Sequence, residues 1–307
     1  MINFNNEKEI PNTFFGGSEQ KRAYEIDGKI YMVKFPDPVR QKKNELSYMN
    51  NQFSEYIGCH IFHALDIPSQ NTFLGEFYTE TGKRKIVVAC ENFCTNGYSL
   101  MEFSKLARAA ASSHDKFPRE LEFVTKTIDE MAFGTKEDKK SFKEQFWDMF
   151  VVDTLIGNSD RHIDNWGFLV KGNHMRFAPI YDCGSALSPL IDEDTMAANL
   201  EDETAFTNLE YNIKSAYRFQ GKRLFYHEIY KNPPQSLKDA VVRIVPKINV
   251  AFLSAAIIRT TPEMSEIRKE YLSKSLMIRY DRILLPSFKR IRKEINYFPQ
   301  QPEERHR

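Results

Sequence analysis

Residues 158–169 read Asn-Ser-Asp-Arg-His-Ile-Asp-Asn-Trp-Gly-Phe-Leu, and this stretch decides how the rest of the chain is interpreted. It is a short polar loop between an apolar helical pattern and a predicted hairpin over residues 167–178. Polar side chains on a short loop between rigid elements are typical of catalytic and binding sites. Asp160 and Asn165 are therefore candidate site residues. A third is Asp182, in the Ala-Pro-Ile-Tyr-Asp-Cys-Gly segment that ends the hairpin.

The sequence on both sides of this loop predicts helices. Residues 137–156 repeat apolar side chains at helical spacing, and Gly157 is a typical helix end. Residues 236–254 and 262–294 show mostly helical patterns as well, with an irregular stretch before them.

The N-terminal third predicts strands around one helix. Residues 22–26 and 30–35 are rich in β-branched and aromatic residues and are joined by Asp-Gly, a dipeptide typical of a tight hairpin. Residues 53–67 carry apolar side chains every four positions, which predicts an amphipathic helix. Two more strands are expected over residues 72–78 and 85–90.

Together these patterns predict an α+β fold with two lobes. A small β-rich lobe with one helix is expected over residues 1–92, and a larger α-helical lobe over residues 93–307.

Composition excludes several classes of protein. The chain has 307 residues, with 43 Lys and Arg against 42 Asp and Glu, so its net charge is +1. A dedicated nucleic-acid binder would show a basic excess, so no direct nucleic-acid contact is expected. The apolar run at residues 248–258 is too short to span a bilayer, so no membrane insertion is expected. The first residues lack the pattern of a signal peptide, which predicts a cytoplasmic protein and leaves open secretion by a signal-independent route.

The candidate residues match what phosphoryl transfer from ATP requires. That reaction uses a carboxylate near the acceptor hydroxyl, an Asn and an Asp on magnesium, and a lysine on the phosphates. Asp160 and Asn165 have the spacing of kinase catalytic loops, and the turn that begins at Asp182 resembles a D-F-G metal-binding turn. Lys34 lies in a predicted strand and needs an anionic partner. Glu55 is preferred for this role, and Glu45 is the alternative.

The chain resembles the HipA-like serine/threonine protein kinases, in a compact form without the extra N-terminal subdomain of larger members. The resemblance is carried by Met-Val-Lys-Phe-Pro at 32–36, Phe-Ser-Glu-Tyr at 53–56, Ile-Val-Val-Ala-Cys at 86–90, and residues 158–169 and 178–185. It implies a bilobal protein-kinase-like fold with ATP and Mg²⁺ as cofactors. It also implies a protein substrate and, as a further partner, an antitoxin or a host protein.

The family pattern implies roles for individual residues. Asp160 corresponds to the catalytic base, Asn165 and Asp182 to the magnesium ligands, and Lys34, oriented by Glu55, to the residue that holds the phosphates.

The same pattern implies further ATP-binding residues. The hinge against which adenine binds corresponds to Glu91 through Phe93. The phosphate-binding loop corresponds to Gly16, Gly17, Ser18 and Lys21, although no G-x-G-x-x-G is present. Autophosphorylation is implied as well, with Ser18 as the candidate, and His162 is expected to structure the catalytic loop.

Two alternative functions fit the same residues. The Asp-Arg-His-x-x-Asn pattern also resembles the catalytic loop of phosphoinositide kinases, although no basic or amphipathic membrane surface is evident in the sequence. A pseudokinase that binds nucleotide and acts only as an interaction module is the other alternative. Residues suited to the base and to both metal ligands occupy all the expected positions, which argues against it.

Overall fold

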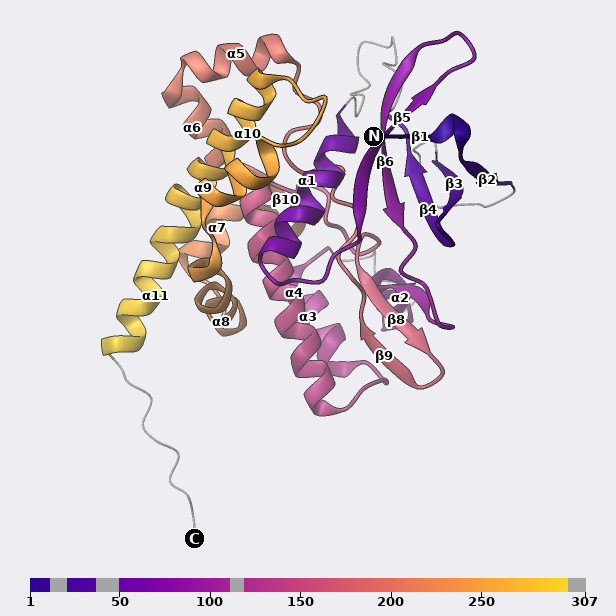
Figure 1. Cartoon of the computed structure of the whole chain (residues 1–307). Coiled ribbons are helices and arrows are strands. Elements are labelled where there is room, and N and C mark those ends of the chain that lie inside the picture. The colour runs from indigo at the N-terminus through magenta and orange to yellow at the C-terminus, as the bar shows by residue number, and fades with distance from the viewer. Residues whose placement is uncertain (12–20, 37–49, 111–118, 298–307) are drawn as a thin grey trace.

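The computed structural model describes residues 1–11, 21–36, 50–110 and 119–297 (Figure 1). Gly16, Gly17 and Ser18 of the expected phosphate-binding loop lie outside the described residues, as does Glu45.

The N-terminal part is a six-stranded sheet in the order β1-β5-β6-β4-β3-β2. All neighbouring strands are antiparallel except β1 and β5. The hairpin predicted at Asp27-Gly28 is confirmed, and both residues have the positive φ angles that a tight turn requires. The strands are β1 (Ile2–Asn3), β2 (Lys8–Ile10), β3 (Lys21–Ile26), β4 (Lys29–Lys34), β5 (Thr72–Tyr78) and β6 (Arg84–Glu91).

Helix α1 (Asn51–Ala64) covers one face of this sheet and lies between the sheet and the C-terminal helices (Figure 1). Its apolar residues Phe53 and Ile57 share a core with Leu74 and Val88 of the sheet. The opposite face of the sheet carries its own buried cluster, which is Phe4, Tyr24, Val33, Phe35, Val87 and Ala89. The alternation of side chains along each strand thus supplies two cores, and the predicted helix is confirmed.

A second, three-stranded sheet carries the loop of interest. It consists of β7 (Ser99–Glu102), β8 (Gly167–Lys171) and β9 (His174–Phe177), in that order. The predicted hairpin is confirmed as β8 and β9, while β7 was not anticipated. Helix α4 (Lys136–Ile156) begins at a capping box formed by Thr135 and Asp138 and ends at Gly157, whose φ is 65°.

The stretch that the sequence suggested to be irregular is instead largely ordered into helices and a hairpin. The strands β10 (Lys214–Phe219) and β11 (Lys222–Phe225) pair around Gln220 and Gly221, both with positive φ. Besides α4, the helical elements of the C-terminal part are α2 (Phe103–Ala110), α3 (Leu121–Glu130), α5 (Glu193–Glu201), α6 (Glu203–Tyr211), α7 (Tyr226–Lys231), α8 (Gln235–Ile244), α9 (Val250–Leu253), α10 (Glu266–Arg279) and α11 (Leu285–Tyr297), with a 3₁₀ turn at Val245–Lys247 and π-helical turns at Ser254–Ile258 and Tyr280–Leu284. A further 3₁₀ turn, Phe4–Asn6, lies between β1 and β2 in the N-terminal part.

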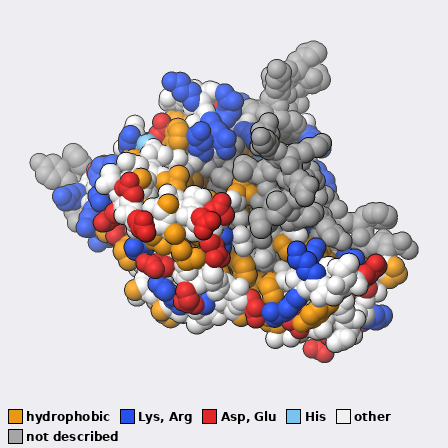
Figure 2. All heavy atoms as spheres, turned by 90° about the horizontal axis from the view of Figure 1, so that it is seen from above, with side chains coloured by type: hydrophobic (Ala, Val, Ile, Leu, Met, Phe, Trp, Pro, Cys, Tyr) orange, Lys and Arg blue, Asp and Glu red, His pale blue; other side chains and the backbone are white. Residues whose placement is uncertain are grey.

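The α+β fold with a β-rich N-terminal part and a helical C-terminal part is therefore confirmed, while the boundary at residues 92 and 93 stays a prediction. Among the described residues, no single helix is both long and apolar enough to cross a membrane. By length and composition alone, one sharply bent pair, Gln235–Lys247 with Val250–Ile258, meets that criterion. The face seen in Figure 2 carries basic and acidic side chains, and neither sign covers it, in keeping with the near-neutral net charge.

Candidate active site

Lys34 connects the sheet, α1 and the turn after β9. It is the last residue of β4, and its Nζ lies 2.9 Å from Glu55 Oε2 and 3.0 Å from Asp182 Oδ1. Lys34 is 4% exposed and Glu55 is fully buried, so neither charge is stabilised by bulk water. A buried ammonium and a buried carboxylate require partners, and the two groups supply this to each other. The described structure thus pairs Lys34 with Glu55, as the sequence predicted.

The turn that carries Asp182 is held directly against α1. Asp182 has a φ of 58°, a left-handed conformation that Asp tolerates better than most residues. A Cβ on Gly58 of α1 would lie 2.6 Å from the Cβ of Cys183, closer than side chains approach. Glycine at position 58 therefore lets α1 sit on this turn. The position of Glu55 on the helix and the position of Asp182 on the turn are consequently coupled.

Asp160 and Asn165 lie together within the polar loop. The side-chain amide of Asn165 donates from Nδ2 to the backbone oxygen of Asp160 at 2.9 Å, so its Oδ1 lies on the other side of the amide. The backbone N–H of Asp160 donates to Asn158 Oδ1 at 3.1 Å. The Asp160 carboxylate is 44% exposed, which leaves it accessible to an acceptor.

His162 contacts carboxylates on both sides of the loop. Its Nε2 lies 3.8 Å from Asp160 Oδ2, and its Nδ1 lies 3.3 Å from Asp164 Oδ2 and 3.2 Å from the backbone nitrogen of Asp164. If Nδ1 accepts the Asp164 N–H, the imidazole proton is on Nε2, facing Asp160. These contacts support the predicted loop-structuring role for His162.

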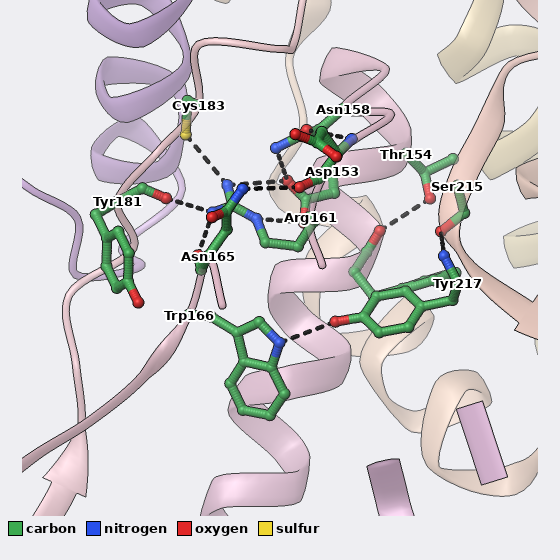
Figure 3. A network of polar contacts seen from close by, with 12 residues as sticks. Asp153, Thr154, Asn158, Arg161, Asn165, Trp166, Tyr181, Cys183, Ser215 and Tyr217 are labelled. Atoms are coloured by element: carbon green, nitrogen blue, oxygen red, sulfur yellow. Dashed lines mark hydrogen bonds and ion pairs between the residues drawn. The ribbon is translucent and has the colours of Figure 1, made fainter. Parts of the chain in front are cut away.

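A buried arginine, which the sequence reasoning missed, organises the loop (Figure 3). Arg161 is 1% exposed and pairs with Asp153 of α4 through Nε, 3.0 Å from Oδ2. Its Nη1 donates to the backbone oxygens of Asn165, at 2.8 Å, and Tyr181. Its Nη2 contacts the sulfur of Cys183 at 3.3 Å. The guanidinium of Arg161 therefore links Asn165 and both neighbours of Asp182 to Asp153, near the end of α4.

The carboxylates of the site have opposite pKa shifts. Burial alone would raise the pKa of Asp182, but the charge and hydrogen bond of Lys34 outweigh it and lower this pKa to about 2. The pKa of Asp160 is raised, mainly by burial, and the negative charge of Asp182 adds to this rise against the opposing effect of His162. Asp182 thus stays ionised, as a metal ligand must, while Asp160 is a stronger base than an ordinary aspartate.

Three of the expected nucleotide-binding residues, Lys21, Glu91 and Phe93, belong to the described part of the chain. Lys21 is the strand partner of Lys34, and its charge helps to lower the pKa of Asp182. Phe93 contacts the ring of Tyr181, whose carbonyl is held by Arg161, with ring centroids 5.8 Å apart. Glu91, at the end of β6, has its backbone oxygen bonded to the side chain of Gln70 at 2.9 Å. Their contacts with adenine or phosphate stay predictions.

The donor set of the site suits a hard cation carried by a nucleotide. Asn165 and Asp182 offer oxygen ligands, which magnesium prefers. The described residues contain no group of three or more His, Cys, Asp or Glu side chains placed to hold a metal by themselves. A metal at this site would therefore complete its shell with phosphate oxygens and water, which is how Mg²⁺ is held in ATP-dependent enzymes.

Comparisons with known proteins agree with this geometry. Residues 13–248 match the model of the HipA-like C-terminal domain. The chain is 37% identical over 282 residues to the serine/threonine-protein kinase CtkA of Helicobacter pylori strain J99, an alignment that covers 89% of this chain and 83% of that protein.

Solved structures show the same relationship. The crystal structure of the Helicobacter pylori proinflammatory kinase CtkA superimposes with a TM-score of 0.86 and 35% identity, covering 95% of this chain and 98% of that chain. HipA of Shewanella oneidensis MR-1, from its complex with HipB and operator DNA, matches with a TM-score of 0.52 and 16% identity over 92% of this chain and 67% of that chain. The latter likeness concerns the fold alone. The bilobal architecture described above is thus kinase-like.

Proposed function

Because the chain belongs to the HipA-like family of serine/threonine kinases, we propose that its loop and turn residues transfer the γ-phosphate of ATP to protein hydroxyls. The single observation that carries this assignment is the position of Lys34 between Glu55 and Asp182, at 2.9 and 3.0 Å. This arrangement places a cation for the phosphates directly beside a carboxylate suited to a metal.

In the proposed reaction, Asp160 orients the serine or threonine hydroxyl and accepts its proton as the hydroxyl oxygen bonds to the γ-phosphorus. The bond between that phosphorus and the β–γ bridging oxygen breaks, and ADP leaves. The raised pKa of Asp160 favours this acceptance, and its half-buried carboxylate keeps an accessible part that is open to the acceptor. Lys34 holds the remaining phosphates against the sheet while Glu55 fixes its position.

Asn165 Oδ1 and the Asp182 carboxylate would hold Mg²⁺, which supplies charge neutralisation on the phosphates when it is bound. The contribution of the chain's own residues is then mostly positioning, because phosphoryl transfer involves little covalent work by the protein. Arg161 carries much of this positioning, since it links Asn165 and Tyr181 to α4. Autophosphorylation at Ser18 is included in the proposal from the family resemblance alone.

The two alternatives from the sequence are less well supported. A phosphoinositide kinase is not favoured, because the relative that matches most of the chain is a protein kinase. A pseudokinase is not favoured either, because that relative is named a serine/threonine-protein kinase and residues suited to the base and metal positions are present in this chain.

The test compares wild type with Asp160→Asn, using γ-labelled ATP, Mg²⁺ and dephosphorylated cell lysate as acceptor. We expect label on serine and threonine with the wild type, and a loss of about 10²–10⁴-fold with the variant, the usual contribution of a general base. Asp129→Asn is the matched control, because Asp129 is an exposed carboxylate on α3, paired with Lys143, and lies outside the site. Transfer by Asp160→Asn at the control rate would contradict the assignment of the base.

A further inference from the structure

Two exposed arginines, Arg108 on α2 and Arg119 just before α3, act on carboxylates of the loop that carries Asp160. The first residues of α2 are attached to the loop, since Phe103 N donates to Trp166 O at 3.0 Å and Ser104 N donates to Ile163 O at 2.9 Å. Two backbone hydrogen bonds thus attach the start of α2 to the loop that carries Asp160. Near the end of α2, Arg108 is 67% exposed, and its Nη2 lies 3.9 Å from Asp164 Oδ1.

A second arginine comes from the segment before α3. The backbone oxygen of Arg119 accepts the N–H of Arg218 at 2.6 Å, and the Glu120 carboxylate lies 3.5 Å from Arg218 Nε. These two contacts fix the backbone of Arg119 against β10. Its side chain is exposed, and it is near enough to the Asp160 carboxylate for its charge to oppose the rise in that pKa.

The contact of Arg108 with Asp164 is exchangeable. An exposed ion pair at such a distance contributes little to stability, so an incoming carboxylate can replace Asp164 without a large penalty. Within the described part of the chain, Arg119 has no carboxylate within 4.0 Å. Arginine also stays protonated at all relevant pH values and accepts a carboxylate in a bidentate geometry.

An acceptor segment that carries carboxylates would be repelled by Asp160, by Asp164 and by the triphosphate of bound ATP. Cations placed between the segment and these anions cancel this repulsion, and such complementarity governs which partner docks. Arg108 lies beside Asp164, and the charge of Arg119 acts on Asp160, so these two cations can offset the repulsion by both carboxylates of the loop.

We propose that Arg108 and Arg119 form an acceptor rim that selects polypeptides with Asp or Glu side chains close to the phosphorylated serine or threonine. The proposal rests on the proposed function and adds the chemistry of the acceptor. Arg218 and Glu120 support the rim by fixing the backbone of Arg119 and do not contact the acceptor.

The test maps phosphorylation sites. Dephosphorylated lysate is incubated with ATP and Mg²⁺ together with wild type or Arg108→Glu/Arg119→Glu, and the sites are sequenced by mass spectrometry. We expect wild-type sites to be enriched in Asp and Glu near the acceptor. One exposed ion pair changes a binding equilibrium by about 1.4- to 5-fold. Losing the pairs of both arginines with the acceptor should therefore reduce the acidic enrichment by about 2- to 30-fold.

Lys126→Glu is the matched control, because Lys126 is equally exposed on α3 but pairs with Glu130 on its own helix. It should keep the wild-type enrichment, and circular dichroism should show all three proteins to be folded. The inference is overturned if wild-type sites show no acidic enrichment, or if the double variant keeps it. Absence of any labelled site with the wild type would instead contradict the proposed function, so the two failures are distinguishable.

Discussion

The buried pair of Asp153 and Arg161 offers the sharpest test of the site's architecture. Both side chains are 1% exposed, and the Asp153 carboxylate also accepts from Asn158 Nδ2 at 3.1 Å. Asp153→Asn preserves the shape of the side chain but removes its charge, which leaves the Arg161 guanidinium buried and uncompensated. Removing one partner of a buried pair costs about 3–5 kcal/mol.

The measurement is thermal unfolding followed by the fluorescence of Trp147 and Trp166, both of which are buried. At roughly 2–4 °C per kcal/mol for domains of 150–250 residues, the cost predicts a Tm lower by about 6–20 °C. Asp129→Asn removes one partner of an exposed pair, where the expected cost is about 0–1 kcal/mol. Equal effects of the two variants would refute the reasoning.

A double variant separates stability from positioning. Asp153→Leu/Arg161→Met replaces the pair by apolar side chains of similar volume, a change that is often neutral or stabilising. We expect it to recover much of the lost Tm. Phosphoryl transfer should stay low, because the contacts of Arg161 with the carbonyls of Asn165 and Tyr181 are gone. Full activity in the double variant would show that Arg161 does not position the loop.

Two further predictions concern the turn and the base. Gly58→Ala places a Cβ 2.6 Å from that of Cys183, so it should push α1 away from the turn that carries Asp182. We expect the free energy of unfolding in urea to fall by about 1–3 kcal/mol and phosphoryl transfer to slow. Wild-type stability and rate would contradict the coupling between the positions of Glu55 and Asp182. Burial raises the pKa of Asp160, while that of Asp182 is lowered to about 2, so of these two carboxylates Asp160 should be protonated first as the pH falls. The value of kcat/KM should therefore fall as the pH drops through the raised pKa, at a higher pH than for an ordinary aspartate. A rate profile that stays flat down to about pH 4 would show that Asp160 is not the base.

Local patterns predicted much of the frame. The spacing of apolar side chains identified the β3–β4 hairpin, α1 and α4. Each of these elements buries one face against a core, so its apolar residues recur at the period of a strand or of a helix. The link between Lys34 and Glu55 was also predicted, since a strand lysine among apolar neighbours requires an anion.

What the sequence did not reveal is mostly long-range pairing. Asp153 looks like an ordinary polar residue in a helix, and nothing in its spacing identifies Arg161 as its partner eight residues later. The contact of Lys34 with Asp182 joins residues 148 positions apart and depends on how the two parts of the fold meet. The β10–β11 hairpin was missed although Gln220-Gly221 carried a turn signal, because short strands beside helices give weak patterns.

The central claim is that Lys34, Asp160, Asn165 and Asp182 form one site for a metal-bound nucleotide. The most direct test uses the Asp160→Asn protein, in which turnover is blocked, and measures ATP affinity by calorimetry with and without Mg²⁺. We predict that Mg²⁺ strengthens ATP binding in this protein and that adding Asp182→Asn removes the strengthening. An equal effect of Mg²⁺ on both proteins would show that Asp182 does not hold the metal and would contradict the account.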